Sequence, residues 1–91
     1  TFALINTTYS AEDAREVLAS LINDKIRFLN TQILSINERF GTNADHLQTR
    51  VTQLQKDRTE LVKLLSAYAE NDMEIEISCD VKMVVKQPIT A

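Results

Sequence analysis

The chain has 91 residues, which predicts a single domain, and 44% of its residues are hydrophobic and 25% charged, as in ordinary globular proteins. This composition excludes the disordered and fibrous classes. The net charge of −3, with ten Lys and Arg residues that are scattered along the chain, argues against a nucleic-acid partner, whose phosphates require a basic face.

The N-terminal part predicts a strand followed by a long helix. Phe2–Asn6 is a short apolar run before two threonines, so we expect a strand over residues 2–7. Ser10 suits the N-cap of a helix over residues 11–40, because its hydroxyl can accept from the amide three residues on. The apolar positions of this helix recur every three or four residues, as in a helix packed along another helix, at Ile22, Ile26, Leu29, Ile33, Ile36 and Phe40.

The only glycine predicts a sharp turn between two helices. Gly41 follows the last apolar position and suits a left-handed C-cap at the start of a turn over residues 41–43. Thr42 or Asn43 can cap a second helix over residues 44–70. So short a turn makes the helices antiparallel neighbours. The seam of the second helix is then Leu47, Val51, Leu54, Leu61, Leu65 and Tyr68, with Arg58 at its one position that is not apolar.

Residues 73–86 alternate apolar and polar side chains, which predicts a half-buried β tail. The tail forms either one strand or two strands broken near residues 78–80, where Ser, Cys and Asp give a weak turn signal. The strand over residues 2–7 enters and the tail leaves the same end of the hairpin, so the two can pair as antiparallel neighbours. An exposed edge of this sheet would be a site for strand addition.

Together these elements predict a mainly α fold with short β segments (α+β), in which a long antiparallel helical hairpin is flanked by an N-terminal strand and a C-terminal strand or hairpin. Both helices also carry apolar residues off the seam, in the half of the hairpin away from Gly41. The chain's own strands or an identical subunit must cover them, and we expect a homodimer that forms a four-helix bundle. The expected interface residues are Val17, Leu21, Phe28, Val62 and Leu64.

A group of charged residues lies at the middle of the predicted seam. Arg58 is level with Lys25 in the expected pairing, and Asp24 and Asp57 flank them. In one interpretation the Arg58 side chain reaches outward to a carboxylate. In another, a buried ion pair among these four residues fixes the register of an oligomer. In a third, Lys25 and Arg58 hold a small anionic ligand.

Candidate catalytic and metal-binding residues are few. His46, at the start of the second helix, is far along the hairpin from Cys79, which argues against a Cys–His nucleophile pair. One His and one Cys cannot supply the ligands of a zinc site. The densest acidic run fits a solvated face and has no calcium-loop pattern; it contains Glu70, Asp72, Glu74 and Glu76. We therefore expect no catalytic residues, no cofactor and no metal.

A short chain of amphipathic helices that dimerises resembles, in outline, the all-helical chorismate mutases. The resemblance covers only the helices, and a β tail stands where such a fold needs a further helix. That family uses Arg and Lys side chains that project into the bundle interior. The resemblance implies this role for Lys25, Arg39, Arg50 and Arg58.

The sequence therefore predicts a non-enzymatic protein–protein interaction or assembly module, such as a small adaptor, regulatory or structural subunit, that acts as a helical homo-oligomer and has a protein partner. The alternative is a small-ligand sensor or minor enzyme of helical-dimer type that uses Lys25 and Arg58. No apolar run approaches the roughly 20 residues of a membrane span, so no membrane partner is expected. The single Cys79 and an N-terminus without signal-peptide features favour a cytoplasmic protein.

Overall fold

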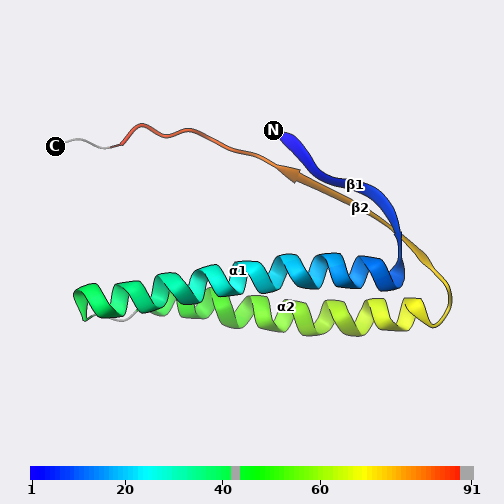
Figure 1. The fold of residues 1–91 in the computed structure, drawn as a ribbon, viewed down its shortest axis with the longest axis horizontal. Helices are drawn as coiled ribbons and strands as arrows, with labels where there is room; N and C mark the ends of the chain where they lie inside the picture. The colour runs from blue at the N-terminus through cyan, green and yellow to red at the C-terminus, as the bar shows by residue number, and fades with distance from the viewer. Residues whose placement is uncertain (42–43, 89–91) are drawn as a thin grey trace.

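The chain folds into two antiparallel helices and two paired strands, as the sequence predicts (Figure 1). The computed structural model describes residues 1–41 and 44–88. Its elements are β1 (Phe2–Ser10), α1 (Ala11–Phe40), α2 (Asp45–Ala69) and β2 (Glu74–Val81). The α+β fold class and the bounds of the first helix are confirmed. Dimerisation stays a prediction.

The strands differ in extent from the prediction. The first strand was expected over residues 2–7, but it reaches Ser10 because pairing with β2 continues to the start of α1. The tail was expected over residues 73–86, but the paired part is the single strand β2. Residues 82–88 are described without a strand partner.

Both ends of α1 have the predicted caps. The Ser10 hydroxyl accepts from the amide of Asp13 at 3.1 Å, which satisfies one of the free amides of the first turn. At the other end Gly41 has φ +60°, and its N–H donates to the carbonyl of Asn37 at 3.1 Å. A side chain other than Gly is disfavoured in this left-handed conformation, so the glycine terminates the helix.

The N-cap of α2 differs from the prediction, and its C-terminus is followed by a residue in the left-handed conformation. The N-cap position belongs to Ala44, which has no side-chain cap bond, and the expected caps Thr42 and Asn43 lie outside the described residues. At the C-terminus, Asp72 has φ +52°. The N–H of Met73 donates to the carbonyl of Tyr68 at 3.2 Å, which gives the bond pattern of a Schellman motif with Asp72 in the place usually taken by Gly.

Two apolar clusters form the core. The first lies between the helices alone, where buried Ile26, Leu29, Val51 and Leu54 pack together with Ile22, Ile33 and Leu47. All seven residues belong to the predicted seams of the two helices. The second lies at the base of the hairpin, the end away from Gly41, where the sheet covers the helices. Its buried members are Ile5, Ala14, Leu65 and Ile77.

The sheet is a two-stranded antiparallel ribbon with one irregularity. The register runs from Phe2 opposite Val81 to Ser10 opposite Glu74. A shift between Ala3 and Ile5 leaves Leu4 as an extra residue on β1, a β-bulge. Because side chains alternate along a strand, Ile75, Ile77 and Cys79 share one face. All three pack on the cluster at the base, which confirms the predicted alternation for these residues, whereas Met73, Met83 and Val85 of the predicted tail are exposed.

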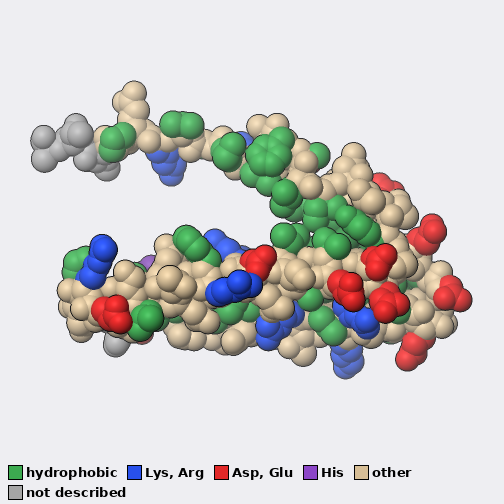
Figure 2. All heavy atoms as spheres, viewed as in Figure 1, with side chains coloured by type: hydrophobic (Ala, Val, Ile, Leu, Met, Phe, Trp, Pro, Cys, Tyr) green, Lys and Arg blue, Asp and Glu red, His purple; other side chains and the backbone are tan. Residues whose placement is uncertain are grey.

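Beyond the base the sheet diverges from the hairpin, which leaves an opening between the sheet and α1 (Figures 1 and 2). Apolar side chains are exposed on both sides of this opening. Ala14, Leu21 and Phe28 follow one another at seven-residue intervals on one face of α1, and their exposed fractions are 0%, 39% and 58%. Along β2 and the segment after it, exposure rises from 7% at Ile77 to 96% at Val85. The fold is therefore closed at the base and open toward the tip.

Candidate functional site

The exposed stripe of α1 is the first candidate surface. Leu21 and Phe28 lie on it, and half-buried Val17 stands beside them near the base. A shallow groove of about 420 Å³ begins there, between β1 and α1, and its lining is Leu4, Ile5, Glu16, Val17, Ser20 and Leu21. Leu4 reaches this groove from the bulge. The sequence pattern gives no sign of this position for Leu4, because no glycine marks the bulge.

On α2, one of the two predicted interface residues is exposed. Leu64 is exposed and lines a second shallow groove, of about 430 Å³, with Glu60, Lys63 and Ala67. Val62 is half-buried. Two residues along a helix turn by about 200°, so Val62 and Leu64 project to opposite sides of α2. The five predicted interface residues therefore do not form one continuous face, and their role in an interface stays a prediction.

The free edge of β2 is the third candidate surface. Within the described residues β2 has β1 as its one neighbour, so the backbone groups on its other edge have no strand partner. The chain continues past Val81 in the same direction through residues 82–88 (Figure 1). Met83, Val84 and Val85 are exposed there. Such an edge is a template for pairing with another strand.

The four charged residues at the middle of the hairpin do not form a buried ion-pair level within the described residues. Asp24 pairs instead with Arg27, at 2.6 Å, and both side chains are exposed. The carboxylate of Asp57 accepts from the amide of Gln53 at 2.9 Å. The partners of Asp24 and Asp57 therefore lie one turn along the same helix, and not on the facing helix.

The two cations proposed to hold an anion have separate surroundings. The guanidinium of half-buried Arg58 donates to the side-chain oxygen of Asn23. The ammonium of exposed Lys25 lies 5.6 Å from the centre of the Phe28 ring, a cation–π distance. Neither residue lines the grooves described above, and Arg39 and Arg50 are exposed. No observation therefore favours an anion site or the part that the chorismate mutase resemblance would give these residues.

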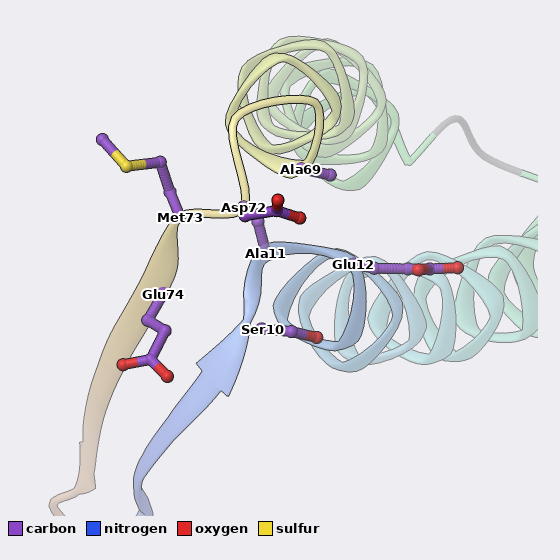
Figure 3. A pocket seen from close by; sticks show the side chains of 7 residues that line it. All are labelled: Ser10, Ala11, Glu12, Ala69, Asp72, Met73 and Glu74. Carbon is purple, nitrogen blue, oxygen red and sulfur yellow. The ribbon is translucent and has the colours of Figure 1, made fainter.

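A cavity of about 230 Å³ lies at the base of the hairpin, where α1 begins and α2 ends (Figure 3). Three carboxylates border it, from Glu12, Asp72 and Glu74. In Figure 3 the side chains of Glu12 and Glu74 point away from each other, so these carboxylates do not converge on one point. Across residues 1–41 and 44–88, no group of three His, Cys, Asp or Glu side chains is placed to hold a metal ion.

His46 and Cys79 are far apart in the fold. His46 is exposed in the first turn of α2, near the tip, whereas half-buried Cys79 packs on the cluster at the base. The structure therefore does not bring these two residues together. Neither α1 nor α2 has the length and apolarity that crossing a membrane requires.

Comparison of the chain with protein families, with curated proteins and with solved structures gave no match. The candidate surfaces therefore rest on the chain's own geometry.

Proposed function

We propose that this protein is a non-enzymatic assembly module that works as a homodimer and presents the assembled surface to a further protein. The observation that supports the proposal best is the size of the exposed surface. One copy exposes 7322 Å². A compact monomer of 10.3 kDa is expected to expose about 5,400 Å².

The difference between the observed and the expected exposed area has the size of a protein interface. It amounts to about 2,000 Å² per copy, and a standard stable interface buries about 800 Å² per partner. The radius of gyration of 17.0 Å agrees, because about 12 Å is expected for a compact chain of this length. The exposed surface includes large apolar side chains, among them Phe28, Leu64 and Met83. A second copy would cover such a surface and lower the cost of its hydration.

A cytoplasmic location is part of the proposal. It is supported by Cys79, which is a free thiol in a half-buried position. A thiol without a disulfide partner suits a reducing compartment. Recovery of the protein mainly from a secreted fraction would contradict this assignment.

The test is the solution mass by light scattering across a dilution series. We expect twice the monomer mass of 10.3 kDa at micromolar concentration, and a fall toward the monomer mass on dilution. A mass that stays at the monomer value at every concentration would contradict the proposal.

A matched pair of variants tests whether the exposed stripe of α1 belongs to the dimer contact. Phe28→Asp places a charge on the stripe of α1 that faces the opening, and it should shift the mass toward the monomer while the helical circular dichroism persists. Leu34 is equally exposed, at 59% against 58%, but lies about 120° away around the helix. Leu34→Asp should therefore leave the dimer intact. Equal effects of the two variants would exclude this stripe from the contact.

A further inference from the structure

The charges along β2 and the segment after it are segregated by sign. Acids occupy the first half of this stretch, with Glu76 and Asp80 on the outer face, and Lys82 and Lys86 follow in the second half. An antiparallel pair places the first half of one strand opposite the second half of the other. A strand with this charge order is therefore complementary to a second copy of itself.

We infer that two copies join edge to edge through β2, antiparallel, with Val81 of each copy on the two-fold axis. This inference rests on the proposed homodimer and specifies its contact. In this register Asp80 lies opposite Lys82 of the second copy. Glu76 lies opposite Lys86 of the second copy, and symmetry repeats both pairs.

Neighbouring registers are less favourable. A register centred on Asp80 places this carboxylate opposite itself, and one centred on Lys82 places two ammonium groups together. Registers centred on Cys79 or Met83 keep only one kind of opposite-charge pair. A register shifted so that odd-numbered residues of one copy lie opposite even-numbered residues of the other would place apolar side chains opposite charged ones. The register centred on Val81 is the one with two kinds of opposite-charge pair and no pair of like charges.

The direction of the backbone groups agrees with this register. The carbonyl of Met73 accepts from the amide of Ala11, so at residue 73 the backbone faces the β1 side. Because this direction alternates along a strand, the even-numbered residues of β2 direct their N–H and C=O groups to the free edge. Asp80 and Lys82 are then a hydrogen-bonded pair across the contact. Cys79 and Met83 are a non-hydrogen-bonded pair, in which side chains lie closest.

The edge of β1 is a poorer site for the same purpose. The bulge at Leu4 interrupts the regular spacing of β1, and a bulge is one of the features that protect edge strands from pairing. The extra residue belongs to β1, so β2 remains regular along its length. The free edge of β2 is thus the one suited to a long ladder.

The contact would also cover the exposed apolar face of the tail. Val85 would lie beside Ile77 of the second copy, and Met83 beside Cys79 of the second copy, on the face that packs against helices. Both hairpins would lie on this face of a four-stranded sheet. Residues 74–88 span about 50 Å as a strand and α1 about 45 Å as a helix, so the hairpins can lie antiparallel along their length.

Cysteine cross-linking tests the register directly. Met83→Cys places a thiol opposite the native Cys79 of the second copy, at a separation that a disulfide can bridge. We expect rapid formation of a covalent dimer under mild oxidation, seen on a non-reducing gel. The matched control is Val84→Cys, at a position of equal exposure, 67% against 69%, whose side chain points to the other face. Equal cross-linking of the two variants would overturn the register.

A charge exchange gives an independent test in solution. At low salt, Lys86→Glu and Glu76→Lys should each weaken the dimer by about tenfold, because each places like charges opposite one another at two symmetric points. The double variant restores opposite charges and should recover the wild-type dissociation constant. A double variant as weak as the single ones would overturn the inference.

The outcomes separate this inference from the proposed function. A wild-type chain that is monomeric at every concentration would contradict both the proposed function and this inference. A wild-type dimer in which the cysteine pair does not discriminate, and the charge exchange does not rescue, retains the proposed assembly function and rejects the β2 contact.

Discussion

The amide N–H of Ala11 donates a 3.1 Å hydrogen bond to the carbonyl oxygen of Met73. This bond joins the first residue of α1 to the residue before β2, and it adds one step to the ladder that ends with Ser10 opposite Glu74. The start of α1, the end of α2 and the sheet therefore meet at the base of the hairpin. Close approach is possible there because Ala11 and Ala14 are small and almost fully buried.

Overpacking at the base should destabilise the fold. Ala14 is fully buried among Ile5, Leu65 and Ile77, so Ala14→Leu has no space for its extra atoms. We expect the free energy of unfolding, measured by urea at fixed protein concentration, to fall by about 2 kcal/mol. Ala67→Leu, at an exposed position of α2, is the control and should change it by less than about 0.5 kcal/mol. Similar losses for both variants would show that the base is not tightly packed.

Truncation within the hairpin seam distinguishes core from surface. Leu29 is 4% exposed in the cluster between the helices, whereas Leu34 of the same helix is largely exposed. Leu29→Ala should cost about 3 kcal/mol of unfolding free energy, through lost burial and the cavity left behind. Leu34→Ala should cost less than about 0.5 kcal/mol. Thermal melts of the pair measure the difference, and a reversed order would refute the seam.

Asp72, which follows α2 in a left-handed backbone conformation, should respond in opposite ways to two substitutions. At φ +52°, Asp72→Val should lower the free energy of unfolding by about 1 to 2 kcal/mol, because a β-branched side chain clashes with the backbone there. Asp72→Gly should raise it by about 0.5 kcal/mol, since glycine adopts this conformation without strain. Chemical denaturation measures both values. A loss for both variants would mean that the Asp72 side chain, and not the backbone, stabilises the turn.

Substitution of Arg58, the one residue of the predicted seam that is not apolar, tests whether this residue has a role in assembly. Arg58 is half-buried, and its guanidinium bonds to the amide oxygen of Asn23 without a carboxylate partner in the described residues. Arg58→Leu should complete the apolar seam and raise the free energy of unfolding by about 1 kcal/mol, with the solution mass unchanged. A change in mass on this substitution would instead support the hypothesis that Arg58 fixes oligomer register.

Much of the local structure could be predicted from the sequence, because its causes lie within a few residues. The Ser10 cap depends on an amide three residues away, and the end of α1 depends on the conformational freedom of Gly41. The helical seams and the alternation of β2 follow from the periodicities of helix and strand. Each of these features is a short-range property and agrees with the structure, except at the ends of the predicted seams, where Phe40 and Tyr68 are exposed.

The candidate sites were less predictable, because they depend on contacts between distant segments. The sequence grouped Lys25 with Arg58 by register, but Arg58 bonds to Asn23 and Lys25 lies over Phe28. The position of Val62 and Leu64 on opposite sides of α2 is a different case, because it follows from helical periodicity alone.

The sequence by itself determined the two helices, the turn at Gly41 and the strand character of the tail, since these follow from side-chain pattern and backbone conformation. Only the tertiary structure decided how far β1 and β2 pair, where Leu4 bulges, and that the sheet leaves the hairpin beyond the base. Those features depend on which distant residues pack at the base, and packing of distant segments balances burial against chain entropy over the whole fold.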